Sequence, residues 1–156
     1  MIPSLRRAAV AVTIASTMLL IAGCSGSSST ASGSTTTTVA VTNSCKFEYQ
    51  AAASKLNGVA RYFSQAAQNG QMTEQFAGFA ANYVDAMKAF DATVSALDCP
   101  DDVTADLASL VAAQTQLEPL VAQFASGGRP PIAEFNAAAQ GVAEAVRRVN
   151  AALGIA

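Results

Sequence analysis

The sequence predicts an all-α fold, an antiparallel up-down four-helix bundle that is stapled by one disulfide bond. Three observations lead to this prediction. Apolar residues recur in steps of three and four along four segments, which is the spacing of one helix face. Turn-forming or proline-containing stretches separate these segments. Two cysteines, Cys45 and Cys99, lie where an antiparallel pair of the first two helices would bring them together.

The first two helices are expected over residues 45–69 and 73–98. The second carries a regular apolar stripe: Phe76, Ala80, Tyr83, Met87, Phe90, Val94 and Leu97. Between the two helices, QNGQMT (68–73) breaks the pattern with residues that suit a helix end followed by a helix start. Because the two helices have nearly equal lengths, folding them back on each other places Cys45 beside Cys99. We therefore predict a disulfide between them, with two free thiols as the alternative.

The second helical pair follows Pro100, which ends the preceding helix. Asp101 and Asp102 are expected to cap the third helix and to favour its dipole, and Pro119 is expected to kink it. The loop SGGRPP (126–131) separates the third helix from the fourth. The third stripe is Val103, Leu107, Leu110, Gln114, Leu117, Val121 and Phe124, and the fourth is Ile132, Phe135, Ala139, Val142, Val146, Val149 and Leu153. The average step of about 3.5 residues is typical of left-handed bundle packing.

The N-terminal segment has the pattern of a secretory signal. Arg6 and Arg7 precede residues 8–22, which contain no charge. A membrane-spanning helix needs about 20 apolar residues, and this run is shorter. The alternative is a short membrane anchor that stays attached.

The end of this apolar run, Ile21-Ala22-Gly23-Cys24, resembles the lipobox of bacterial lipoproteins. The resemblance implies that residues 1–23 are a signal peptide cleaved before Cys24. It also implies that Cys24 carries a lipid anchor with acyl chains such as palmitate. The mature chain would then be held at the extracytoplasmic face of the cell membrane, where two acyl chains give stable anchoring. The composition is also similar to that of actinobacterial lipoproteins.

The segment after Cys24 is rich in serine and threonine and is expected to be a tether. Residues 24–43 contain no aromatic and no charged residue, so they cannot bury enough apolar surface to offset the entropy of ordering. Thr35–Thr38 are candidates for O-linked sugars, with a plain spacer as the alternative. The helical domain is expected over residues 44–156.

The charge of the mature chain argues against nucleic acid as a partner. The whole sequence has nine basic and eleven acidic residues. Removal of Arg6 and Arg7 leaves seven basic residues against the same eleven acidic ones, a net charge of about −4. A nucleic-acid-binding domain is usually basic. Contact with the membrane is therefore expected through the lipid on Cys24 rather than through charge.

The sequence contains no set of residues that predicts catalysis. It has no histidine, the commonest general base and metal ligand, and it has neither a nucleophile elbow nor a phosphate-binding loop. The acidic residues Asp98, Asp101, Asp102 and Asp106 suggest either a calcium site or helix capping with a solvated face, and capping is favoured because they lack the EF-hand pattern. We therefore predict no enzyme activity, no metal and no cofactor.

Two functions remain open at this level. The first is a binding or adaptor module for another envelope protein. The alternative is a carrier of a small hydrophobic ligand or lipid in a cavity between the helices. The candidate cavity residues are Phe63, Phe79, Phe90, Phe124 and Phe135. Gln114 and Asn82 are candidate buried polar residues, which either fix the helix register or lie at the edge of the bundle.

Overall fold

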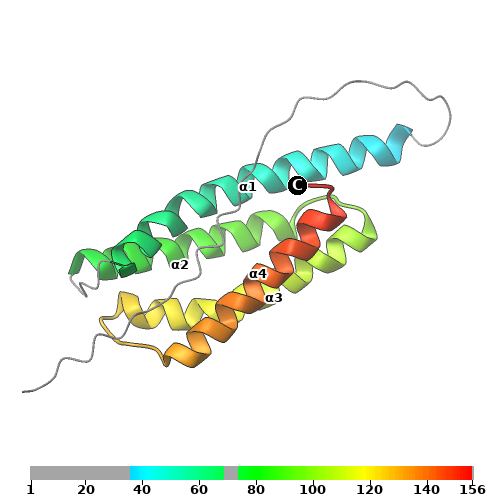
Figure 1. Ribbon diagram of the computed structural model, residues 1–156. Coiled ribbons are helices and arrows are strands. Elements are labelled where there is room, and N and C mark those ends of the chain that lie inside the picture. The colour runs from blue at the N-terminus through cyan, green and yellow to red at the C-terminus, as the bar shows by residue number, and fades with distance from the viewer. Residues whose placement is uncertain (1–35, 69–73, 156) are drawn as a thin grey trace, which may run out of the picture.

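The computed structural model describes residues 36–68 and 74–155, with side chains from residue 43 onward. The described chain forms four helices and no strand: α1 (Thr36–Gln68), α2 (Glu74–Ser95), α3 (Asp101–Ala125) and α4 (Ile132–Ala152). Successive helices run in opposite directions, as the colours in Figure 1 show. The predicted all-α, four-helix fold is confirmed.

Helix α1 begins earlier than the sequence predicted. It starts at Thr36, so residues 36–43, which we had assigned to the tether, are helical. The prediction relied on the poor helix propensity of a threonine-rich segment. Extending an existing helix needs no new nucleus and adds one hydrogen bond per residue, so the packed part of α1 can support this extension. The predicted signal peptide, Cys24 and the rest of the tether lie outside the described residues.

The ends of the other helices differ from prediction by a few residues at most. Helix α2 ends at Ser95 rather than at residue 98. Helix α3 begins at Asp101 with Pro100 in the cap position, so Asp101 lies in the first turn and does not cap the helix. The helix continues through Pro119 to Ala125.

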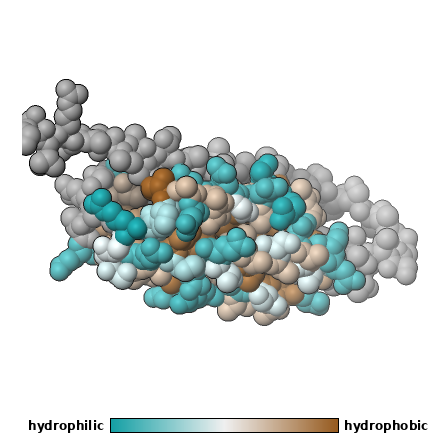
Figure 2. Space-filling view, turned by 90° about the horizontal axis from the view of Figure 1, so that it is seen from below, coloured by the Kyte–Doolittle hydropathy of each residue, from teal (hydrophilic) through white to brown (hydrophobic). Residues whose placement is uncertain are grey.

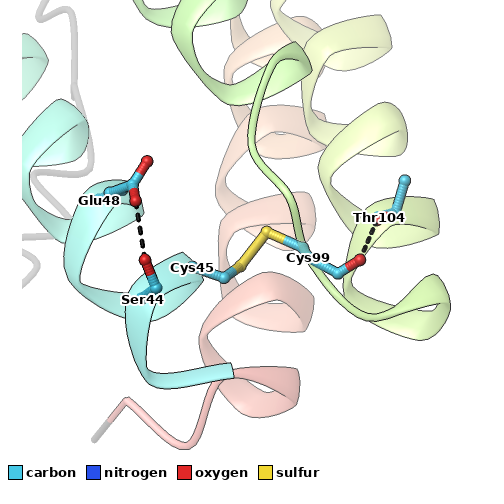
Figure 3. The surroundings of a disulfide bond; sticks show 5 residues. All are labelled: Ser44, Cys45, Glu48, Cys99 and Thr104. Atoms are coloured by element: carbon cyan, nitrogen blue, oxygen red, sulfur yellow. Dashed lines mark hydrogen bonds between the residues drawn. A yellow bond between two sulfur atoms is a disulfide. The ribbon is translucent and has the colours of Figure 1, made fainter. Parts of the chain in front are cut away.

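The predicted disulfide between Cys45 and Cys99 is present. The two sulfur atoms are 2.01 Å apart and the two Cα atoms 5.3 Å apart. Figure 3 shows that the bond joins α1 to the segment between α2 and α3. On either side, the Ser44 hydroxyl donates a hydrogen bond to Glu48 Oε1 at 2.9 Å, and the Thr104 hydroxyl donates to the Cys99 carbonyl at 3.2 Å. The disulfide thus ties α1 to the rest of the bundle at one end.

The core consists of two clusters of buried residues, one near each end of the bundle. The cluster at the disulfide end contains Cys45, Tyr49, Ala52, Ala53, Phe90, Val94, Val103, Leu107, Leu110, Ala145, Val149 and Leu153. The cluster at the opposite end contains Phe63, Phe76, Ala80, Val84, Met87, Leu117, Val121 and Phe135. Leu56 and Val142 are half-buried and pack against both clusters. The two clusters therefore meet near the middle of the bundle.

The bundle is more open between α1 and α4 than on its other sides. Backbones of consecutive helices approach closely, whereas no Cα atom of α1 lies within 8 Å of a Cα atom of α4 in the described ranges. One bridge across this side is a hydrogen bond from Lys46 Nζ to the Gly154 carbonyl, 2.8 Å long. A side chain of α1 is thus hydrogen-bonded to the backbone just after the end of α4.

The glycines inside the helices do not mark close helix contacts. Gly58, Gly78 and Gly141 are exposed, and a Cβ atom added to any of them would meet nothing within 4 Å. Close approach of another helix therefore does not explain any of the three.

Candidate ligand cavity

A partly enclosed cavity of about 90 Å³ lies in the interior at the level where the two core clusters meet. All four helices contribute to its wall. The lining residues are Tyr49, Ala53, Leu56, Asn57 and Ala60 from α1, Tyr83, Met87 and Phe90 from α2, Gln114 and Leu117 from α3, and Val142 and Val146 from α4. Five of the six half-buried residues in the lining lie on α1 and α4, which places the more open side of the cavity toward these two helices.

Gln114 is the buried polar residue of the cavity wall. It lies in the apolar stripe of α3, between Leu110 of one core cluster and Leu117 of the other. Only 2% of its surface is exposed, and its Oε1 atom has no hydrogen-bond partner among the described residues. Buried polar atoms are nearly always paired, and an unpaired one costs about 1–3 kcal/mol. Of the two candidate buried polar residues, Gln114 is buried and Asn82 is exposed.

The remaining polar groups of the wall are uncharged. Burial raises the pKa of Tyr49 from 10.0 to about 12, and burial also raises the pKa of Tyr83. Both phenols therefore stay neutral at physiological pH. Asn57 contributes an amide, and no acidic or basic side chain lines the cavity. The cavity is suited to neutral groups, because a buried charge without a partner is very costly.

Of the five phenylalanines predicted to line a cavity, Phe90 lines this one. Phe90 lies in the wall and packs edge-on against Tyr49, with ring centroids 6.2 Å apart. Phe63, Phe124 and Phe135 instead pack with one another at the opposite end of the bundle; the Phe63–Phe124 and Phe124–Phe135 centroid distances are 6.0 and 5.7 Å. These rings fill that end of the interior.

Phe79 lies outside the core and stacks on an exposed aromatic ring. Its ring is 6.4 Å from that of Tyr62, nearly parallel to it, and 62% of Tyr62 is exposed. Phe47, near the disulfide, is 74% exposed. On the face of the molecule seen in Figure 2, hydrophobic residues form small areas separated by polar ones.

An acidic residue outside the cavity has an unusual environment that the sequence did not reveal. Desolvation by burial, with a smaller contribution from the negative charge of Glu118, raises the pKa of Asp91 from 3.8 to about 6. Its Oδ1 atom is buried without a hydrogen-bond partner among the described residues. Glu118 itself forms an ion pair with Lys88, at 3.1 Å. The shift follows from packing between α2 and α3, which periodicity alone does not report.

The described residues contain no group of three or more histidine, cysteine, aspartate or glutamate side chains that could hold a metal ion. Asp101 and Asp102 lie in the first turn of α3, where negative charge favours the helix dipole. Both cysteines of the bundle are joined to each other.

Comparison with protein-family models, curated proteins and solved structures finds no match to this chain. Within residues 36–68 and 74–155, no helix combines the length and the apolar character needed to cross a bilayer. The function is therefore inferred from the sequence signals and from the cavity.

Proposed function

We propose that this protein is a lipid-anchored, non-enzymatic binding protein of the cell envelope, and that its helical domain carries a small hydrophobic ligand. The observation that favours a carrier is the cavity lined by all four helices, with the unpaired Oε1 atom of Gln114 in its wall. An adaptor function makes no use of such a cavity. Ligand sites are typically concave, mostly apolar and equipped with a few polar groups, as this one is.

The anchor in this proposal is the lipid on Cys24, as the lipobox resemblance implies. Helix α1 begins twelve positions after Cys24, and a chain of that length spans at most about 40 Å. The end of the bundle that carries the disulfide would then lie toward the membrane, at the extracytoplasmic face. An oxidising compartment is the setting in which a structural disulfide persists.

The absence of histidine from the whole sequence supports a non-enzymatic role. Both cysteines of the helical domain are consumed by the disulfide, so neither is available as a nucleophile. The polar groups of the cavity are two tyrosine hydroxyls and two amides. Such groups orient a ligand by hydrogen bonding.

An adaptor function is the second candidate, and exposed aromatic residues favour it. Phe47 is 74% exposed and Tyr62 is 62% exposed. Aromatic residues are enriched in protein interfaces. Both lie on α1, so a partner protein would contact this helix.

Native mass spectrometry of the protein extracted from its own membrane without reduction tests the proposal. We expect the mass of residues 24–156 with a diacylglyceryl group in place of the Cys24 thiol hydrogen and with two hydrogens fewer for the disulfide, together with an additional adduct that leaves on activation. Ala60→Leu, which places a larger side chain in the cavity wall, should abolish the adduct. Ala51→Leu is the matched control, because Ala51 is exposed on the same helix and its substitution should leave the adduct in place.

The outcomes separate the two candidates. A wild-type protein that carries the lipid and the disulfide but no adduct contradicts the carrier function and leaves the adaptor, for which cross-linking should capture a partner. An adduct that persists in Ala60→Leu would place the ligand elsewhere and would also contradict the proposed site. The melting temperatures of both variants verify that they are folded.

A further inference from the structure

The lining of the cavity limits the kind of ligand that it can hold. Its apolar side chains include Leu56, Met87 and Leu117, while its polar groups carry no charge. A carboxylate or ammonium group would enter without a counter-ion, at a cost of many kcal/mol. The ligand should therefore be electrically neutral.

Gln114 adds a second restriction. A leucine at this position would continue the apolar stripe from Leu110 to Leu117, yet the chain has an amide there. The amide oxygen does not connect helices, since Oε1 has no hydrogen-bond partner among the described residues. It lines the cavity instead. A polar group on the ligand would give it the hydrogen bond that the protein does not supply.

Resting on the proposed carrier function, we propose that the cavity binds an uncharged amphiphile with a compact apolar body and one hydroxyl group, and that Gln114 selects this class by hydrogen-bonding the hydroxyl. The apolar body contacts the side chains of Met87, Leu117 and Val146. A hydroxyl group can donate to the amide oxygen or accept from the amide nitrogen, so either orientation of the Gln114 side chain serves.

The volume of the cavity is enough to enclose part of one small ring. It measures about 90 Å³, compared with the roughly 150 Å³ of an enclosed apolar cavity that binds benzene. A six-membered ring would thus fill the cavity and extend into the opening between α1 and α4. Longer ligands would project through the same opening.

Phenol and toluene are suitable probes, because they have nearly the same size and differ in a hydroxyl against a methyl group. Benzoate supplies the charged comparison. The full-length chain is reconstituted in lipid nanodiscs, and binding is followed by NMR of the ¹³C-labelled methyl group of Met87, which lines the cavity. Empty nanodiscs measure the partition of each probe into lipid, so that the free concentrations are known.

The methyl group of toluene gains about as much from burial as one hydrogen bond contributes, so the informative quantity is the ratio of phenol affinity to toluene affinity. We expect this ratio to fall about fivefold in Gln114→Leu, which is the effect of one hydrogen bond, while toluene still binds and benzoate does not bind either protein. Gln116→Leu, which replaces an exposed glutamine on the same helix, should leave the ratio unchanged. Gln114→Met is a second variant of similar length, and unfolding midpoints of all three verify their folding.

The possible failures are distinguishable. If none of the probes shifts the Met87 signal, the cavity does not bind ligands and the proposed function fails together with this inference. If the ratio of phenol affinity to toluene affinity is the same in Gln114→Leu as in wild type, the carrier function stands and the role of Gln114 is refuted. Tight binding of benzoate would contradict the neutral ligand class.

Discussion

Removal of the Cys45–Cys99 disulfide is predicted to lower the free energy of unfolding by about 4 kcal/mol. The perturbation is the double substitution Cys45→Ala with Cys99→Ala, which leaves no free thiol to form other bonds. Cys45 is only 1% exposed, and alanine is the smallest apolar replacement that keeps the helix intact. The variant removes the cross-link and also the buried Cys45 sulfur, whereas reduced wild-type protein keeps both sulfur atoms and has lost the cross-link alone.

The magnitude follows from the length of the loop that the disulfide closes. The two cysteines are 54 positions apart, and the chain-entropy relation assigns about 4 kcal/mol to a loop of this size. The stabilisation arises mainly because the cross-link restricts the unfolded chain. For a domain of this size, the loss corresponds to a fall in melting temperature on the order of 15 °C.

Urea unfolding followed by circular dichroism at 222 nm measures the change. Wild-type protein with and without a reducing agent should differ by about the same amount as wild type and the double variant. The reducing agent should have no effect on the double variant, which serves as the control. A difference below about 1 kcal/mol between wild type and the double variant would refute the entropic reasoning.

The other predictions concern the surroundings of single residues. The folded-state pKa of Asp91 is raised from 3.8 to about 6, so the free energy of unfolding should decrease as pH rises from about 4 to about 6, by about 1 kcal/mol after allowance for solvent screening. Asp91→Asn should abolish this part of the pH dependence in urea titrations. An unchanged pH dependence in this variant would contradict the raised pKa of Asp91. Phe124→Ala should lower the free energy of unfolding by about 3 kcal/mol, because it removes a ring that packs on several others. The control is Phe47→Ala at an exposed position, which should lower it by less than about 0.5 kcal/mol. Equal losses would show that the ring cluster is not a main source of stability. Cys24→Ala should release the protein from the membrane fraction without changing its circular dichroism, and continued retention would contradict the lipid anchor.

Much of the fold could be predicted because it depends on local pattern. The stripes and the loop 126–131 placed the start of α4 to within one residue, and Pro100 marked the beginning of α3. The disulfide could be predicted because the two expected helix lengths bring Cys45 next to Cys99. The start of α1 could not, since residues 36–43 have poor intrinsic propensity and their helix is an extension of a packed one.

The cavity was harder to predict, because it depends on the distance between two helices that are far apart in the sequence. Of the five phenylalanines chosen by aromatic type, Phe90 lines this cavity. Phe63 and Phe124 fill a different part of the interior. The useful signal was a polar residue inside an apolar stripe, Gln114, which marks the level of the cavity. The separation of α1 from α4 cannot be predicted from the spacing of the apolar residues along either helix.

The wide side of the bundle has a consequence for how fast a ligand can exchange. Each of the other three sides joins helices that are consecutive in the chain, so a connecting segment restrains their separation. Between α1 and α4 the polypeptide makes no such connection, and the hydrogen bond from Lys46 to Gly154 is exposed. Entry by this route requires movement of side chains and breaks no backbone hydrogen bond within a helix. We therefore expect a ligand to enter and leave on the timescale of side-chain and small helix motions, far faster than the bundle unfolds.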